Sequence, residues 1–259
     1  MAVERIETIV AEADAAPVAD RRQLDPEPVT LVQFPYVWGR NVSPFGLKLE
    51  TWLKLASIPY DVRPSLAKHQ APKGKFPYIL DGGTPIADSS LIIQHLKRSR
   101  GINPDAGLNA REQAEAVALQ RLFEEHLFFI IVYSRWMDPE GFAAVGEGFF
   151  AAMPLPARPF VRGAMRSRIR RTLQLQGIGR HSRAEVYDMG AADLRAVADY
   201  LDDKPFLLGD RLTSIDAVAF GFLANILLVP VETDLKRAAL GYPNLVAWVE
   251  SMEAGLTEV

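Results

Sequence analysis

Short runs of β-branched and aromatic residues alternate with helical patterns in the first hundred residues. Runs at 29–34, 60–63 and 77–80, with a shorter one at 85–87, are typical of strands. After Ser43, apolar residues recur on one helical face, and a second helix is predicted over 89–97. The predicted order is therefore βαβ followed by ββα.

The remainder of the chain has a helical pattern throughout. Helices are predicted over 106–136, 162–176, 188–201, 213–229 and 243–254, and the Gly- and Pro-containing stretch 138–159 breaks the pattern. No strand pattern competes, so an all-α domain is expected. We predict a flexible arm over 1–28, an α/β domain over 29–103 and an all-α domain over 104–259.

Two helix starts carry clear signals. Ser43 is a suitable N-cap, and Pro44 suits the first helical position because its missing N–H has no intrahelical acceptor. Thr213 and Asp216 have the spacing of a capping box, which indicates a structural role.

A proline at the start of a strand suggests a ligand site. Pro77 cannot donate to a sheet ladder, and a cis bond there would turn the backbone of Phe76 outward to pair with an extended ligand. Asp88 and Ser89 then open a helix, whose free N–H groups suit a carboxylate while Asp88 suits an ammonium group. Together these residues match the α-amino acid end of a small peptide.

These motifs resemble the soluble glutathione transferases. The resemblance rests on the 43–46 segment (SPFG), Phe76-Pro77 and Asp88-Ser89, and the runs at 177–181, 201–210 and 213–221 are similar to the failed-axon-connections and metaxin-like branch. It implies a thioredoxin-like N-terminal domain, an all-α C-terminal domain and a homodimer. It also implies that glutathione is the cosubstrate.

The expected glutathione contacts are Phe76, Pro77, Asp88, Ser89 and Lys75. A cation such as Lys75 could meet the second carboxylate of the ligand, although an exposed lysine without that role is equally consistent with the sequence.

Ser43 is the first catalytic candidate. Its hydroxyl could donate to the thiolate of bound glutathione. Lowering the pKa of that thiol by about two units requires about 2.7 kcal/mol, which a hydroxyl donor together with a helix N-terminus can supply. Tyr36 is the main alternative, Asn41 and Trp38 lie in the same loop, and Ser43 could instead only cap the helix.

The resemblance implies a cleft for the second substrate near Trp38, Tyr133, Trp136 and Arg168. The predicted function is attack of the glutathione thiolate on a small, electrophilic, hydrophobic molecule. The rival hypothesis is a non-catalytic binding or scaffolding protein of the metaxin-like kind. The absence of cysteine keeps this hypothesis open, because cysteine is common near the helix start in that branch and this chain has none.

Composition narrows the partners further. A formal net charge of −3 gives no electrostatic argument that the protein binds nucleic acid. No apolar stretch reaches the roughly 18 residues that a membrane span needs. The chain has no cysteine and its 4 histidines are scattered, so no metal site is expected. The clustered arginines of 162–176 could bind an anion or form a solvated face. We expect a cytoplasmic protein.

Overall fold

The computed structural model describes residues 27–151 and 153–257, so nearly all of the predicted arm lies outside the described residues. The first domain contains a four-stranded sheet in the order β2-β1-β3-β4. Its strands are β1 (Val29–Gln33), β2 (Tyr60–Pro64), β3 (Tyr78–Asp81) and β4 (Thr84–Ala87). β1 is parallel to β2 and antiparallel to β3, and β3 is antiparallel to β4. A short 3₁₀ helix, η1 (Lys68–Gln70), follows β2.

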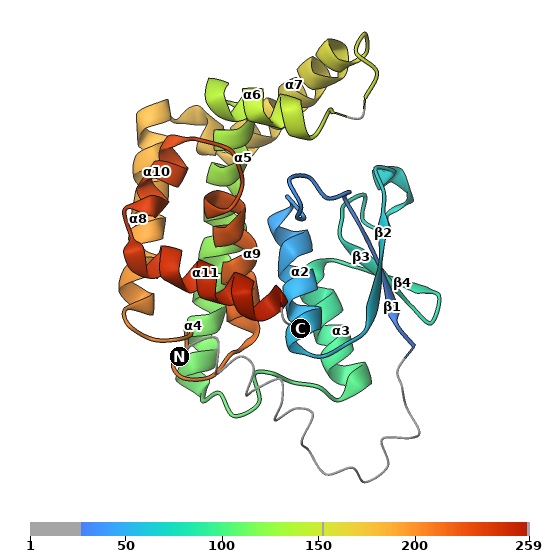
Figure 1. Ribbon diagram of the computed structural model, residues 1–259, viewed down its shortest axis with the longest axis vertical. Helices are drawn as coiled ribbons and strands as arrows, with labels where there is room; N and C mark the ends of the chain where they lie inside the picture. Colours follow the sequence, from blue (N-terminus) through green and yellow to red (C-terminus); the bar gives the residue numbers. More distant parts are fainter. Residues whose placement is uncertain (1–26, 152, 258–259) are drawn as a thin grey trace.

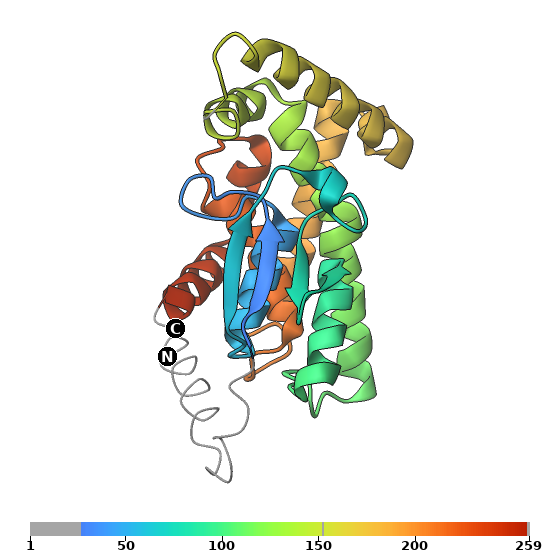
Figure 2. The same cartoon turned by 90° about the vertical axis from the view of Figure 1, so that its right-hand side faces the viewer.

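Two helices cover one face of this sheet, α2 (Pro44–Leu55) and α3 (Ser89–Arg100) (Figure 1). Leu49, Trp52 and Leu53 of α2 are fully buried, as the spacing of apolar residues predicts. Figure 2 views the sheet from its other face, with the helices behind it. The predicted α/β order is confirmed.

The second domain is helical, as predicted. It contains α4 (Ala110–Arg121), η2 (Leu122–Leu127), α5 (Phe128–Trp136), α6 (Pro139–Gly148), α7 (Arg158–Gln176), η3 (Ile178–Arg180), α8 (Arg183–Leu201), α9 (Ser214–Leu227), α10 (Asp234–Leu240) and α11 (Pro243–Thr257). The segment η2 is a π-helical insertion that joins α4 and α5. The predicted capping box of Thr213 and Asp216 is confirmed at the start of α9. The exact domain boundary at 103/104 stays a prediction.

The prediction that 138–159 lacks helical structure is wrong in its first half, where α6 lies. Asp138 caps this helix by accepting from the N–H of Glu140, and Pro139 stands at its first position. Gly141 allows α6 to approach α5 so closely that a Cβ would lie 1.9 Å from the carbonyl oxygen of Ser134. The glycine therefore serves helix packing rather than a chain break.

Other helices also differ from the prediction. α4 begins at Ala110 rather than at 106, and α7 begins at Arg158 rather than at 162. α8 begins at Arg183, five residues earlier than expected, because Ser182 and Glu185 form a capping box. The seven-residue helix α10 was not predicted; Thr233 caps it.

The two domains meet closely where α2 crosses α9. A Cβ on Gly221 would lie 2.7 Å from both the carbonyl oxygen of Pro44 and the backbone nitrogen of Lys48. The missing side chain thus permits backbone contact between the domains and fixes α2 against the helical bundle.

Candidate functional site

The start of α2 presents a hydroxyl that is not used in capping. Ser43 has an extended conformation, but its hydroxyl makes no cap hydrogen bond. The Oδ1 atom of Asn41 instead accepts the N–H of Ser43 at 2.9 Å. The hydroxyl of Ser43 therefore remains available to a ligand at a helix N-terminus, which favours negative charge.

A buried arginine from the second domain holds the loop before α2. Arg135 donates to the carbonyl oxygen of Val42 at 2.7 Å and to that of Asn225 at 2.6 Å. Asn225 in turn donates to the carbonyl oxygen of Asn41 at 3.2 Å. Burial lowers the pKa of Arg135 to about 10. Sequence reasoning missed this residue, although a charged residue at the end of the apolar run 127–132 was a usable signal.

The Phe76-Pro77 peptide bond is cis. The β1–β3 ladder begins at Tyr78, and neither backbone group of Phe76 forms a hydrogen bond within the described part of the chain. The side chain of Phe76 is buried against Phe34, with ring centroids 5.1 Å apart. The backbone before β3 can thus accept an extended partner.

Asp88 and Ser89 form the start of α3. Asp88 lies in an unusual conformation with φ of 81°, and its side chain accepts from the N–H groups of Ser90 and Leu91. The N–H of Ser89 makes no hydrogen bond to any described residue, so this helix start retains a donor for a carboxylate.

A buried polar cluster lies behind this helix start and connects the domains. Lys48 donates to the hydroxyls of Ser90 at 2.9 Å and Ser89 at 3.3 Å, and pairs with Glu124 at 2.6 Å. Burial lowers the pKa of Lys48, while the Glu124 carboxylate opposes that shift. Sequence reasoning missed Lys48, whose position among the apolar residues of α2 was the only signal.

Tyr36 and Asn41 have different surroundings from Ser43. The hydroxyl of Tyr36 donates to Glu50 on α2 at 2.9 Å, and burial together with the Glu50 charge raises the pKa of Tyr36. Tyr36 and Glu50 line a pocket of about 290 Å³ between α2 and α11. Asn41 is fully buried. Their catalytic assignments remain predictions.

The predicted residues of the second-substrate cleft are brought together in part. Trp38 and Trp136 both make edge contacts with Phe149, at ring-centroid distances of 6.1 Å and 6.3 Å. Tyr133 packs against Tyr187 instead, at 6.3 Å.

The remaining predicted contacts are cationic. Arg168 is exposed on α7. Burial is the main cause that lowers the pKa of Lys68, and the positive charges of Arg168 and Lys75 lower it further. Lys75 is also exposed. These three cations come from η1, the loop before β3 and α7.

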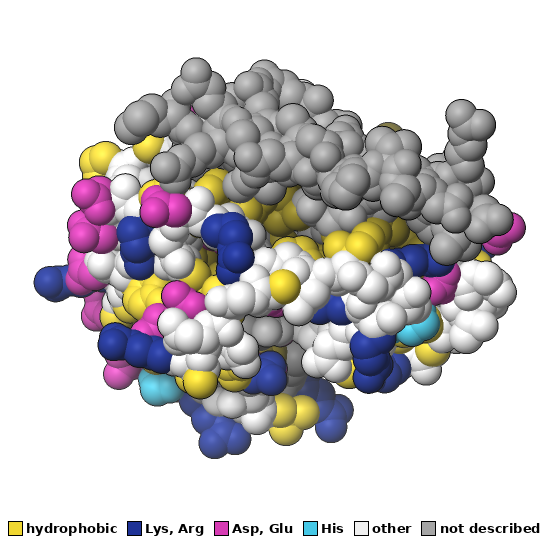
Figure 3. All heavy atoms as spheres, turned by 90° about the horizontal axis from the view of Figure 1, so that it is seen from below, with side chains coloured by type: hydrophobic (Ala, Val, Ile, Leu, Met, Phe, Trp, Pro, Cys, Tyr) yellow, Lys and Arg dark blue, Asp and Glu magenta, His cyan; other side chains and the backbone are white. Residues whose placement is uncertain are grey.

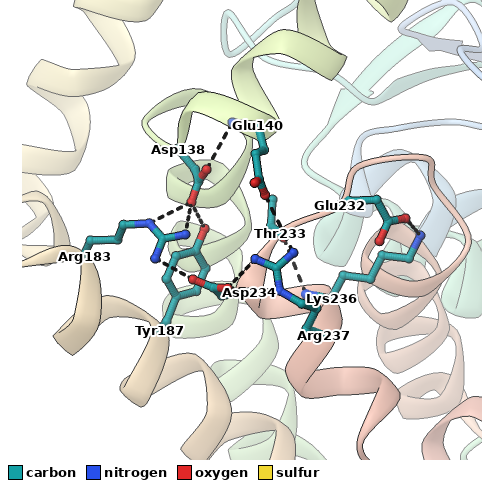
Figure 4. Close-up of polar contacts among 9 residues, drawn as sticks. All are labelled: Asp138, Glu140, Arg183, Tyr187, Glu232, Thr233, Asp234, Lys236 and Arg237. Carbon is teal, nitrogen blue, oxygen red and sulfur yellow. Dashed lines mark hydrogen bonds and ion pairs between the residues drawn. The ribbon is translucent and has the colours of Figure 1, made fainter.

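A network of charged residues fixes α6, whose C-cap residue is Phe149 (Figure 4). Asp138 accepts from the hydroxyl of Tyr187 at 2.7 Å and pairs with Arg183 at 2.9 Å. Arg183 also pairs with Asp234 at 2.5 Å, so the starts of α6, α8 and α10 are joined. The position of α6 therefore depends on two other helices, α8 and α10.

Three of the scattered histidines lie close to carboxylates. His95 lies 2.7 Å from Asp81, His126 lies 2.6 Å from Asp193, and His181 lies 4.0 Å from Glu185. Within residues 27–151 and 153–257, no three His, Asp or Glu side chains converge in a way that could hold a metal ion. Among the same residues, no helix combines the length and apolar character needed to cross a bilayer.

Comparison with known proteins identifies the family. A family model described as the glutathione S-transferase N-terminal domain matches residues 44–141, and one described as the C-terminal domain matches 190–252. The isoprene-epoxide glutathione S-transferase of Rhodococcus sp. (strain AD45) is 34% identical over 86% of this chain and 96% of its own length. The chain belongs to the glutathione S-transferase family.

The comparisons also bear out the similarity to the failed-axon-connections and metaxin branch. Failed axon connections of Drosophila melanogaster is 30% identical over 93% of this chain, which spans 64% of that protein. Metaxin-1 of Mus musculus is 28% identical over 82% of this chain and 69% of its own. A rice glutathione transferase solved in complex with glutathione shares the fold, with a TM-score of 0.58, 16% identity and coverage of 90% of this chain and 91% of that one.

Proposed function

We propose that this protein is a glutathione-dependent transferase that binds glutathione between the starts of α2, β3 and α3. The observation that carries the proposal is a set of polar groups that make no hydrogen bond to residues 27–151 or 153–257: the hydroxyl of Ser43, the backbone of Phe76 and the N–H of Ser89. Glutathione carries a thiol, a peptide backbone and an α-amino acid end, which are the partners these groups require.

In this proposal each residue has a separate role. Ser89 and Asp88 bind the carboxylate and ammonium of the γ-glutamyl end, and Phe76 pairs with the ligand backbone. Ser43 donates to the thiolate, which stabilises its charge and lowers the pKa of the thiol. Lys75 meets the second carboxylate. The thiolate then attacks the electrophilic carbon of a small molecule, forming a carbon–sulfur bond.

The acceptor is proposed to be a small hydrophobic electrophile such as an epoxide. The Rhodococcus relative, named for an isoprene epoxide, supports this class. Trp38 and Phe149, which are partly exposed in an aromatic cluster with the buried Trp136, support an apolar acceptor. Opening of an epoxide would leave an alkoxide that must take up a proton, so water or a cleft donor completes the reaction.

Calorimetric titration with glutathione tests the binding step. Wild type should bind saturably. Ser89→Ala keeps the backbone N–H but removes the hydroxyl, which accepts from Lys48 and can donate its own hydrogen to the ligand carboxylate. This variant should therefore bind about tenfold more weakly, because a hydrogen bond to a charged group contributes roughly 1.5–3 kcal/mol. Ser99→Ala, on the exposed surface of the same helix, is the matched control. Absence of binding heat with folded wild-type protein would contradict the proposal.

The rival function is a non-catalytic binding protein of the metaxin-like kind. The similarity to metaxin-1 and to failed axon connections favours it. Saturable glutathione binding without turnover of any epoxide would support this alternative. We further propose a cytoplasmic homodimer, and a monomeric mass in light scattering would contradict dimerisation.

A further inference from the structure

A long segment of this acidic chain contains only basic charges. Residues 148–184 include 8 arginines and no Asp or Glu, although the whole chain has a net charge of −3. Helix α7 occupies the centre of this segment. The excess of positive charge is therefore concentrated at one place on the molecule.

Three of these arginines face inward. Arg158, Arg162 and Arg166 follow one another at four-residue spacing and donate to backbone carbonyl oxygens, for example Arg166 to Trp136 at 2.9 Å. Carbonyl acceptors are neutral, so these bonds orient the guanidinium groups without cancelling their charge. The inner face of α7 is thus fixed to α5, α6 and the preceding loop.

The opposite face of α7 combines exposed apolar residues with cations. Phe160, Arg171 and Leu175 are separated by eleven and four residues and share one side of the helix. Phe160 is 80% exposed and Leu175 is 74% exposed, and Leu155 in the loop before α7 is 72% exposed. Arg171 lies on this side of the helix, and Arg170, four residues after Arg166, lies at its edge. Both are exposed, and their side chains make no hydrogen bond or ion pair with the described residues. We call these five residues the α7 outer face.

The position of α7 leaves this face accessible. Figures 1 and 2 place α7 at one end of the long axis of the molecule, beyond α6. Where side chains are described, the face at the other end carries Lys and Arg next to Asp and Glu (Figure 3). The single-sign character of the α7 outer face is therefore not a general property of the surface.

We propose that the α7 outer face binds the surface of an anionic lipid bilayer. Arg170 and Arg171 would pair with lipid phosphates and carboxylates, and Phe160, Leu155 and Leu175 would enter the boundary between headgroups and acyl chains. A nucleic acid would use the two arginines but leave the three apolar side chains in water, so the combination favours lipid. The α7 outer face would lie on the bilayer surface, and this inference does not depend on glutathione binding.

Vesicle sedimentation tests the proposal. The full chain should sediment with phosphatidylcholine vesicles that contain about one third phosphatidylserine, and much less with phosphatidylcholine alone. Arg170→Gln with Arg171→Gln should weaken binding by roughly thirtyfold, and added salt should weaken binding of wild type. Phe160→Ser with Leu175→Ser should weaken it as well.

Matched controls come from exposed residues elsewhere. Arg98→Gln on α3 and Leu240→Ser on α10 remove the same kinds of side chain and should bind the anionic vesicles as wild type does. Circular dichroism confirms that each variant is folded.

Three results would overturn the proposal. The first is no sedimentation of wild type with anionic vesicles. The second is equal binding of these vesicles by the α7 variants and wild type. The third is binding of wild type to duplex DNA and not to vesicles, with loss of DNA binding in the arginine variant.

Discussion

At the scale of single residues, the proposed chemistry depends on the hydroxyl of Ser43. Within residues 27–151 and 153–257 this hydroxyl makes no cap hydrogen bond, and Oδ1 of Asn41 accepts the backbone N–H of Ser43. The hydroxyl is therefore available to donate to a ligand at the start of α2.

Replacing Ser43 with cysteine tests whether this position faces the glutathione sulfur. In Ser43→Cys a thiolate at the helix N-terminus should attack oxidised glutathione, form a mixed disulfide and release one reduced glutathione. Intact-mass spectrometry should show one added glutathionyl group. Wild type, which has no cysteine, should stay unmodified.

Ser99→Cys provides the reference for an ordinary exposed thiol and should react much more slowly. If Ser43→Cys reacts no faster than Ser99→Cys while still binding glutathione, Ser43 does not contact the sulfur. Tyr36 would then be the better candidate, despite its hydrogen bond to Glu50.

The residues that connect the domains could not be predicted from the sequence. Pro44 and the Thr213–Asp216 box follow from rules that involve neighbours within a few residues. Lys48 and Arg135 depend on partners 76 and 90 residues away, Glu124 and Asn225. A single sequence gives no pairing for such buried charges, so only their unusual apolar surroundings could have marked them.

At the scale of elements, strands and long amphipathic helices were predictable because their spacing repeats. The errors occur where short-range signals compete: Gly and Pro in α6 suggested a break, and α10 is too short for a clear period. In α6 the proline stands at the first helical position and Gly141 serves packing, so both residues are compatible with a helix.

The crossing of α2 and α9 should be sensitive to a single methyl group. Gly221→Ala would place a Cβ 2.7 Å from backbone atoms of α2, which cannot move aside as a flexible side chain can. We expect a loss of about 1–3 kcal/mol in the free energy of unfolding. Chemical denaturation monitored by circular dichroism measures it.

Gly163→Ala in α7 is the control for this change, because no atom of the described residues outside the adjoining helix backbone lies within 4 Å of its added Cβ. It should be neutral or stabilise the protein by up to about 1 kcal/mol, since alanine favours helix more than glycine does. Equal denaturation midpoints for Gly221→Ala and wild type would contradict close packing at this crossing.

At the scale of the whole molecule, two domains cooperate to form the proposed site. The first domain contributes Ser43, the cis Phe76-Pro77 bond and Ser89, while the second positions them through Arg135 and Glu124. The family and its two-domain fold followed from sequence, whereas the cooperation between domains became visible only in three dimensions.

The most direct test of this account is the ionisation of bound glutathione. Ultraviolet absorbance of the thiolate, followed against pH at saturating protein, gives the pKa of the bound thiol. The account predicts a pKa about two units below the ordinary value of about 8.5, and a smaller decrease in Ser43→Ala, where the helix N-terminus remains but the hydroxyl is lost. A bound thiol that titrates at its ordinary pKa in wild type would contradict the account.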